Sequence, residues 1–187
     1  MEKIHHLITD RWSPKAFDER PLDAMQIRLL FEAAKWAPSA SNAQPWRFIY
    51  ATREMPEYEV LLDLMNEDNR IWASTAPLLL LPLAQAVSTY KNRRNRLAFY
   101  ETGMAVGNLL LQATAMGLLA HQIGGYDAQR ARTELSIPDR YEPMTIMAVG
   151  YKGDPGRLPE DVAAWDYRER TRMETDQFMI RGRCEES

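Results

Sequence analysis

Residues 33–48, AAKWAPSASNAQPWRF, are the stretch that decides the fold. They begin as the end of a helix whose apolar residues recur every three or four positions, and Pro38 ends that helix. From there to Pro45, small residues and short amides compete with helical hydrogen bonding and leave polar groups available. Residues 46–52, WRFIYAT, are dense in aromatic and β-branched types, which predicts a strand. The loop between helix and strand is either a plain connection or a rigid loop shaped around a flat ligand. The two tryptophans and two prolines that frame it favour the second interpretation.

Further helices and strands are predicted on both sides of this stretch. Asp23 begins the first long helix, and Gln26 three residues later makes a capping box. Apolar spacing predicts other helices at residues 5–9, 55–65, 97–116 and 127–135. Strands are predicted at residues 46–52, 78–84, 118–123 and 145–151, and Pro82 indicates an edge or a bulge in the second. Helices interleaved with strands in this way indicate an α+β fold in which helices cover a small sheet.

The helix predicted at residues 97–116 is apolar or small on nearly all sides. Gly103 and Gly107 leave no side chain along one line of it, so a second backbone could approach closely there. In a chain of this size, a second subunit buries such a helix more easily than its own domain does. We therefore expect a homodimer.

The composition limits the kinds of partner. A net charge of −3 and a pI of about 5.7 give no overall attraction to nucleic acid or to an acidic membrane, so any anion site must be local. The first residues do not form a signal peptide, and the apolar runs are too short to span a bilayer. We expect a single domain over residues 1–187, with about 165–187 as an extension that either packs on the partner subunit or is disordered.

Cysteine and histidine are scarce. The single cysteine, Cys184, excludes an internal disulfide framework and fits a reducing cytoplasm; it is read as an incidental thiol rather than a nucleophile. His5, His6 and His121 lack the spacing of metal ligands, so we expect no metal site.

Three basic clusters are candidates for anion binding. In residues 11–15, RWSPK, two cations and a hydroxyl are what a phosphate monoester would use; a solvated basic turn is the alternative. Residues 168–172, RERTR, would place three arginines on one side of an extended segment, or would form a solvated helix. Residues 91–96, KNRRNR, are more simply a solvated loop or helix start. A fourth, uncharged candidate is the pair Gly124 and Gly125 after a predicted strand, because glycines allow backbone N–H groups to approach a ligand.

Taken in order, these segments resemble the FMN-dependent nitroreductase family. Residues 11–17, RWSPKAF, resemble its opening R-x-S motif, and residues 32–48 match its most specific stretch, EAAxxAPSxxNxQPWRF. The long helix ending in Gly-Leu, the Gly-Gly turn, the AVGY strand at 148–151 and the late R-x-R follow in the family's order. These motifs, taken in order, cover nearly the whole chain, which makes the resemblance specific.

The resemblance implies an α+β homodimer with a central, mostly antiparallel sheet flanked by helices. A long buried helix would lie at the dimer interface, with two FMN sites between the subunits. Carried over to this sequence, Arg11 and Ser13 would contact the FMN phosphate and ribityl chain, with Trp12 between them. Arg170 and Arg172 would complete the phosphate clamp.

The resemblance also implies residues around the flavin ring. Lys15 would reach its pyrimidine edge, and Asn69 would bind nearby. The ring would be bordered from the other subunit by Pro38, Ser39, Ala40 and Asn42. Its dimethylbenzene-to-N5 side would be lined by Gln122, Ile123, Gly124 and Gly125.

The implied activity is that of an NAD(P)H-dependent FMN oxidoreductase. NADH or NADPH would give a hydride to flavin N5, and the electrons would pass to a nitroaromatic, quinone-like or enone-like small molecule. Lys15 would stabilise negative charge on the ring, and the Gly124 N–H would bind N5. The alternatives are a specialised flavin reductase or dehalogenase of the same fold, and a non-catalytic FMN-binding module. Trp72 stands where related enzymes often carry a second cation, so it would alter the flavin potential or stack on substrate.

Overall fold

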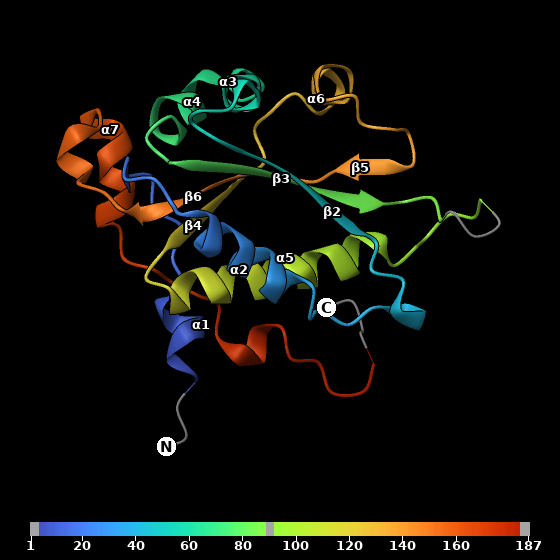
Figure 1. Ribbon diagram of the computed structural model, residues 1–187. Helices are drawn as coiled ribbons and strands as arrows, with labels where there is room; N and C mark the ends of the chain where they lie inside the picture. The colour runs from blue at the N-terminus through green and yellow to red at the C-terminus, as the bar shows by residue number, and fades with distance from the viewer. Residues whose placement is uncertain (1–3, 89–91, 184–187) are drawn as a thin grey trace.

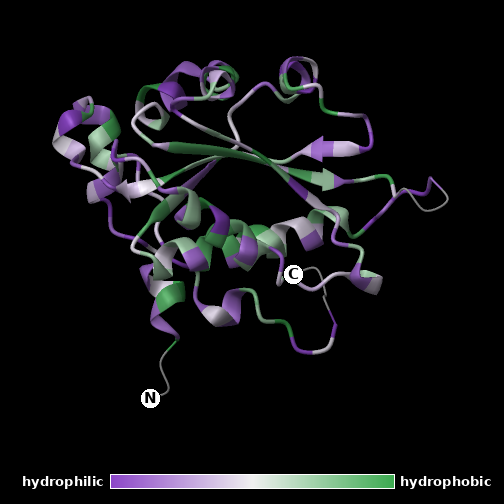
Figure 2. Cartoon of the chain, in the orientation of Figure 1, coloured by the Kyte–Doolittle hydropathy of each residue, from purple (hydrophilic) through white to green (hydrophobic). Residues whose placement is uncertain are grey.

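The sheet is built around β3 (Leu78–Gln85), in a computed structural model that describes residues 4–88 and 92–183 (Figure 1). Every β3 residue before Gln85 is buried. Because successive side chains of a strand point to opposite faces, Leu78 and Leu80 enter one core and Leu79 and Leu81 the other. The sheet is therefore covered on both faces, and Figure 2 shows β3 as a continuous hydrophobic band.

The strands pair antiparallel throughout the described sheet. Its main order is β1 (Phe17–Asp18), β6 (Ile146–Lys152), β3 and β2 (Trp46–Thr52). β4 (Leu119–Ile123) pairs with β6, and β5 (Tyr141–Pro143) pairs with β3. The four strands predicted from the sequence are all present, and the expected antiparallel sheet is confirmed.

Pro82 does not lie in an edge strand, which corrects one of the two alternatives, but a bulge is present beside it. From Leu80 to Leu83, β3 advances three residues while the paired chain advances four, from Met147 to Pro143. Pro82 lies in a central strand, opposite Phe48 of β2. On its other side β3 changes partner, from β6 at Leu80 to β5 at Leu83. The Pro82 carbonyl accepts a hydrogen bond from Met144 N in this gap. The missing N–H of proline faces the same gap, so no ladder hydrogen bond to β2 is lost.

Helices cover both faces of the sheet (Figure 1). One face carries α2 (Ala24–Ala34) and α5 (Ala98–Ala115), and α1 (His6–Asp10) packs against α5. The other carries α3 (Pro56–Asp63), α4 (Glu67–Ala73) and α6 (Ala128–Glu134). The capping box is confirmed, because Asp23 accepts from Gln26 N while the Gln26 side chain accepts from Asp23 N. No helix in the described ranges is long and apolar enough to cross a membrane.

The long helix α5 is buried on only one side within the single chain. Its inward residues include Ala105, Leu109 and Ala113, whereas Tyr100 is 70% exposed. A Cβ added at Gly103 or Gly107 would have nothing within 4 Å. The line of small residues is therefore open.

The C-terminal region is a chain of short helical turns joined by extended segments. η2 (Pro155–Arg157) and α7 (Glu160–Ala163) lead into η3 (Ala164–Tyr167), and η4 (Thr175–Gln177) follows later. Residues 168–174 between η3 and η4 form no helix, so the extended alternative predicted for the arginine cluster holds. The segment passes close to α1, where Arg170 bonds Thr9 (Figure 1). Cys184 and Lys91 lie outside the described residues.

Candidate functional site

Three arginines from the two ends of the chain meet beside the loop after α1. Arg11, Arg170 and Arg172 line a cleft of about 340 Å³, together with Ser13. Arg11 Nη1 donates to Ser13 Oγ at 3.1 Å. Arg170 Nη1 donates to the carbonyls of Thr9 and Arg11, at 2.9 and 3.0 Å. The segments predicted to hold a phosphate are thus brought together from more than 150 positions apart, as the sequence separation of 159 for the Arg170–Arg11 bond shows.

The electrostatics of this cluster favour an anion. Burial lowers the pKa of Arg11, and the neighbouring Arg172 and Arg170 lower it further. Within the described ranges, none of these three guanidiniums forms an ion pair with a carboxylate. Like charges held close together without a counter-ion are stabilised by an anion that accepts several hydrogen bonds, and arginine suits phosphate oxygens. The residues present therefore fit a phosphate group.

The loop that carries Arg11 and Ser13 is held by its backbone. Lys15 N donates to Asp166 Oδ1 at 2.7 Å, and Ala16 N donates to Asp166 Oδ2 at 2.9 Å. Trp165 Nε1 donates to the Ser13 carbonyl at 3.1 Å. Lys15 extends over the Trp165 ring, with Nζ 5.3 Å from its centroid. Neither Trp165 nor Asp166 was predicted, since nothing local to them signals a partner so distant along the chain.

His121 joins the same loop to β4. Its Nδ1 lies 2.8 Å from the Pro14 carbonyl, and because a carbonyl only accepts, Nδ1 carries the proton. The ring stacks on Trp72 at 4.5 Å between centroids and lies 6.0 Å from Trp165. Burial lowers the pKa of His121, which favours the neutral ring. His121 thus has a structural role, as expected for a histidine without metal-ligand spacing.

Trp72 does not reach a substrate site, which corrects one of the two roles considered for it. It is 0% exposed, in the core between His121 and Phe17, whose ring centroid lies 6.4 Å away. Direct stacking on a substrate is therefore excluded. Trp72 therefore acts on the site only indirectly: it stacks on His121, and His121 in turn binds the Pro14 carbonyl.

The turn after β4 packs against the start of α4. Asn66 N donates to the Gly125 carbonyl at 3.1 Å. A Cβ on Gly125 would lie 2.9 Å from Asn69 Nδ2, so only glycine leaves Asn69 in place. Gly124 and Gln122 are exposed, whereas the Ile123 side chain is 2% exposed in the core. Asn69 and Gly125 are thus brought together, and Ile123 offers a ligand only its backbone.

The polar loop after α2 lies apart from the arginine cluster. Its turn η1 (Ala40–Asn42) contains positive φ angles at Ser41 and Asn42. Ala40 N donates at 2.7 Å to Glu101, a carboxylate near the start of α5 that is 2% exposed. Ser39 Oγ accepts from Gln44 N at 3.0 Å. Figure 1 shows η1 and η3 at opposite sides of the molecule.

A groove along α5 runs between these two regions. It has a volume of about 390 Å³, and it is lined by both Arg11 and Pro38, with Gly107 and Asn108 on its floor. Gly107, on the open side of α5, therefore lines a hollow that also includes Arg11 from the loop after α1 and Pro38 from the polar loop.

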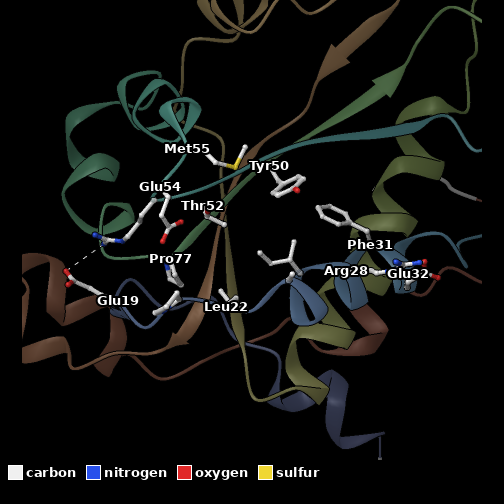
Figure 3. A pocket seen from close by; sticks show the side chains of 14 residues that line it. Glu19, Leu22, Arg28, Phe31, Glu32, Tyr50, Thr52, Glu54, Met55 and Pro77 are labelled. Carbon is white, nitrogen blue, oxygen red and sulfur yellow. Dashed lines mark ion pairs between the residues drawn. The ribbon is translucent and has the colours of Figure 1, made fainter.

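A larger cavity, of about 620 Å³, lies between α2 and β2 (Figure 3). Phe31, Tyr50 and Met55 point into it. Its charged rim is internally paired, by Arg28–Glu32 at 3.9 Å and Arg53–Glu19 at 3.8 Å. None of the residues predicted to bind a ligand lines it. Size alone would favour this cavity, but the unpaired charge lies at the arginine cluster.

No group of three or more histidine, cysteine or acidic side chains suited to a metal occurs in the part of the chain that the structure describes. The site chemistry available from the described residues is therefore anion binding, backbone N–H donation and a lysine cation.

Comparison with known proteins agrees with this geometry. A solved structure titled as an oxidoreductase containing FMN is 32% identical and superposes with a TM-score of 0.92, covering 97% of this chain and 93% of its own. A putative nitroreductase of Desulfovibrio desulfuricans in complex with FMN is 22% identical with a TM-score of 0.74, over 96% of each chain, and shows the fold alone.

Sequence relatives lead to the same group. A Streptomyces coelicolor protein, named "Putative NADH dehydrogenase/NAD(P)H nitroreductase", is 24% identical over 80% of this chain and 83% of its own length. An uncharacterized 15.4 kDa protein of Mycolicibacterium smegmatis is 30% identical over 67% of this chain and 83% of its own. The pattern of the Nitroreductase family matches residues 8–70 and 56–151. The chain belongs to the nitroreductase family.

Proposed function

We propose that the protein is an FMN-dependent oxidoreductase. It takes a hydride from NADH or NADPH and passes electrons to nitroaromatic, quinone-like or enone-like acceptors. The observation that carries the proposal is the cluster of Arg11, Arg170 and Arg172 beside Ser13, which suits a phosphate monoester. Glu169 lines the same cleft, but within the described ranges none of the three guanidiniums forms an ion pair. The similar structure titled as containing FMN, and the relative named for NAD(P)H, support the cofactor and the reductant.

The phosphate and ribityl chain are assigned to Arg11, Ser13, Arg170 and Arg172. Arg11 and Ser13 are already joined by a hydrogen bond at 3.1 Å, so both donors face one small volume. Trp12 lines the same cleft and closes its side.

The flavin ring is assigned to residues that one subunit supplies around Lys15. FMN, when bound, supplies the capacity to accept a hydride and to release electrons. Lys15 places a cation near the pyrimidine edge, where it favours negative charge. Gly124 is exposed after β4, and its backbone N–H is our candidate donor to flavin N5. Asn69 is held against Gly125, and Gln122 to Gly125 belong with Lys15 because His121 joins β4 to the Pro14 carbonyl.

The second side of the ring is assigned to a partner subunit. Pro38 shares a groove with Arg11 in the single chain, whereas the turn η1, which carries Ala40 and Asn42, lies on the opposite side of the molecule from η3; this arrangement favours use of the polar loop by a neighbour (Figure 1). The exposed apolar side chains of the helical face and the tail support a homodimer that buries α5. They include Trp36, Phe99, Tyr100, Met173, Phe178 and Ile180.

The remaining proposals concern the chain as a whole. Residues 1–187 form one domain, and about 165–187 are an extension that meets the partner subunit. A single cysteine and an acidic balance favour a cytoplasmic location. Nucleic acid and membranes are not among the proposed partners, because the basic residues gather in a local cluster on an acidic chain.

The proposal is tested by reconstituting the purified protein with FMN and titrating it anaerobically with NADH and with NADPH. Bleaching of the flavin absorbance by either nicotinamide is expected, followed by reoxidation on adding a nitroaromatic or a quinone. Absence of bound flavin after reconstitution would falsify the proposal. Bound flavin that neither nicotinamide reduces favours a non-catalytic FMN-binding module. Reduction by nicotinamide with poor turnover on every generic acceptor favours a specialised reductase or dehalogenase.

A further inference from the structure

We infer that Asp166 is a positioning residue, which fixes the loop of residues 11–16 in its cofactor-binding shape from the opposite end of the chain. The inference rests on the proposed function, because the loop carries Arg11, Ser13 and Lys15. It assigns to the segment after α7 a role in forming the cofactor site that goes beyond its arginines.

The geometry of Asp166 is that of a two-pronged acceptor. Its two carboxylate oxygens each take one backbone N–H, from Lys15 at 2.7 Å and from Ala16 at 2.9 Å. Hydrogen bonds to an ionised carboxylate are about twice as strong as neutral ones. Two of them on adjacent peptide units fix both the position and the orientation of the chain at Lys15.

Neighbouring groups complete the hold on this loop. Trp165 Nε1 binds the Ser13 carbonyl at 3.1 Å, and His121 Nδ1 binds the Pro14 carbonyl at 2.8 Å. Four successive residues, 13–16, are therefore each held by one polar group from a distant element. The loop gains its shape from these side chains rather than from its own local hydrogen bonds.

The loop needs these hydrogen bonds because repulsion between Arg11 and the neighbouring arginines opposes its folded shape. Arg11 is half-buried next to Arg170 and Arg172, and repulsion among the three favours opening of the cleft when no anion is bound. Asp166 keeps the loop in place without using up the guanidiniums, since it bonds only backbone N–H groups. Arg11 and Arg172 each use Nη1 for one hydrogen bond within the chain, to Ser13 Oγ and to the Thr171 carbonyl, and their other N–H groups remain available to the ligand.

The hold is also reciprocal. Arg170, four residues after Asp166, donates to the carbonyls of Thr9 and Arg11 at 2.9 and 3.0 Å. The loop therefore fixes the segment 165–172 as much as the segment fixes the loop. Any ligand that binds the ordered loop must, by linkage, also favour docking of this segment.

The test compares FMN affinity, followed by quenching of flavin fluorescence, in Asp166→Ala, Asp166→Asn and a matched control, Asp161→Asn. Asp161 is an exposed carboxylate on α7, five residues away in the same segment. The dissociation constant is expected to rise about tenfold or more for Asp166→Ala, because the competent loop becomes a minor population. Asp166→Asn keeps one acceptor oxygen, so a smaller rise is expected, and Asp161→Asn should match the wild type.

Two further measurements separate positioning from general stability. Excess FMN should restore the reductase rate of Asp166→Ala to near the wild-type value, which a damaged catalytic group would not allow. FMN should slow trypsin cleavage after Arg168 and Arg170 in the wild type and slow it less in Asp166→Ala, as reciprocal linkage requires. If Asp166→Ala does not fold, Trp165→Phe removes only the bond to the Ser13 carbonyl and should show a smaller rise in the dissociation constant.

The inference is wrong if Asp166→Ala, or in its place Trp165→Phe, binds FMN as tightly as the wild type. Failure of the wild type to bind FMN is a different result, and it removes the proposed function instead. In that case, if the wild type and Asp166→Ala were equally sensitive to trypsin without ligand, the claim that Asp166 holds the loop would be wrong as well.

Discussion

Arg11 stands at the centre of the anion site, and its replacement gives the most direct residue-scale prediction. Arg11→Ala should weaken FMN binding by about 1.5–3 kcal/mol, the scale of a charge-assisted hydrogen bond. The loss measured by calorimetric titration will be reduced to the extent that removing one of three like charges relieves repulsion of Arg170 and Arg172. Arg181→Ala, in the exposed tail, is the control for a general change in charge. Unchanged affinity for Arg11→Ala would move the phosphate site elsewhere.

His121 gives a prediction about pH. Burial is the main reason that its folded-state pKa is below the ordinary value of 6.5, and Lys15 and Arg11 act in the same direction. The Pro14 carbonyl and Asp166 act in the opposite direction. As the pH falls below about 6.5, the unfolded chain takes up a proton that the folded chain resists, so the free energy of unfolding decreases. Above that pH both states are neutral and the contribution is fully present.

Urea unfolding at pH 7.5 and at pH 5.5 checks this prediction. The wild type should lose more stability between the two pH values than His121→Asn, whose amide keeps a donor but does not titrate. His6→Asn, at an exposed position, should behave like the wild type. An equal loss in wild type and His121→Asn would mean that other groups set the pH dependence.

Sequence predicts a site residue when its chemistry is local. The spacing of Arg11, Ser13 and Lys15, and the alternation of Arg170 and Arg172, were sufficient to propose a phosphate site. Asp166 has no such pattern, because its partners lie 150 and 151 positions away and it touches only backbone atoms. A backbone N–H carries no residue identity, so no motif records it. The precise roles of these residues toward FMN stay predictions.

Among the elements, long and strongly patterned segments were predicted to within a residue or two. β2 occupies the predicted 46–52, and α5 spans Ala98–Ala115 against the predicted 97–116. The strands and α-helices missed were β1, β5, α4 and α7. The two strands are two and three residues long and are defined by their partners. α4 follows its N-cap Asn66 with a polar first turn that lacks the apolar spacing of the predicted helices, and α7 has only four residues.

β1 is short, but it follows directly on the loop of residues 11–16, which gives an element-scale prediction. A Cβ on Gly153 would lie 2.4 Å from the backbone carbon and oxygen of Phe17 in β1. Gly153 N also donates to the Ala16 carbonyl at 3.0 Å. Gly153→Ala should therefore push β1 away from β6 and lower the free energy of unfolding by about 1–3 kcal/mol.

FMN affinity should fall together with stability in Gly153→Ala, because the displaced strand follows directly on the loop. Chemical denaturation and flavin fluorescence measure the two effects. Gly156→Ala is the control, since its added Cβ would lie 3.2 Å from the flexible Asp154 carboxylate rather than from backbone. If Gly153→Ala were as stable as the wild type, β1 would have made room for the Cβ without lowering the free energy of unfolding.

On the scale of the whole molecule, the open side of α5 leads to a prediction about assembly. Gly107 lies in the groove between Arg11 and Pro38, and an added Cβ meets nothing within 4 Å. Gly107→Arg should leave the fold of the single chain intact, because an arginine favours the helix more than glycine does. It should prevent close approach of a second copy and so give a monomer.

Light scattering coupled to size exclusion would measure the mass, and flavin absorbance would measure the cofactor retained. If Ser39 and Asn42 serve the neighbour's flavin, the monomer should lose FMN as well as its partner. Gly107→Ala, which adds only a methyl group, is the matched control. A Gly107→Arg dimer that retains FMN would place the subunit interface elsewhere.

The whole-molecule features were the hardest to predict from residues alone. The α+β class and the antiparallel sheet followed from the order of helices and strands, and the family follows from motifs spread over the chain. Which of its helices covers which face, and the change of partner at Pro82, depend on packing that no single segment specifies. Pro82 is an example: it lacks an N–H for a ladder hydrogen bond, as expected of proline, yet it lies in a central strand.

The bonds from Asp166 to the loop at Lys15 also set an order of events during synthesis. The first 152 residues contain every strand of the described sheet, so a growing chain acquires the material of its core before residue 166 exists. The loop of residues 11–16 is made early, yet its hold is in place only after residue 166 has left the ribosome. Chains that stop before residue 166 would therefore contain every strand of the described sheet but lack this hold, and under the inference above they would take up FMN poorly.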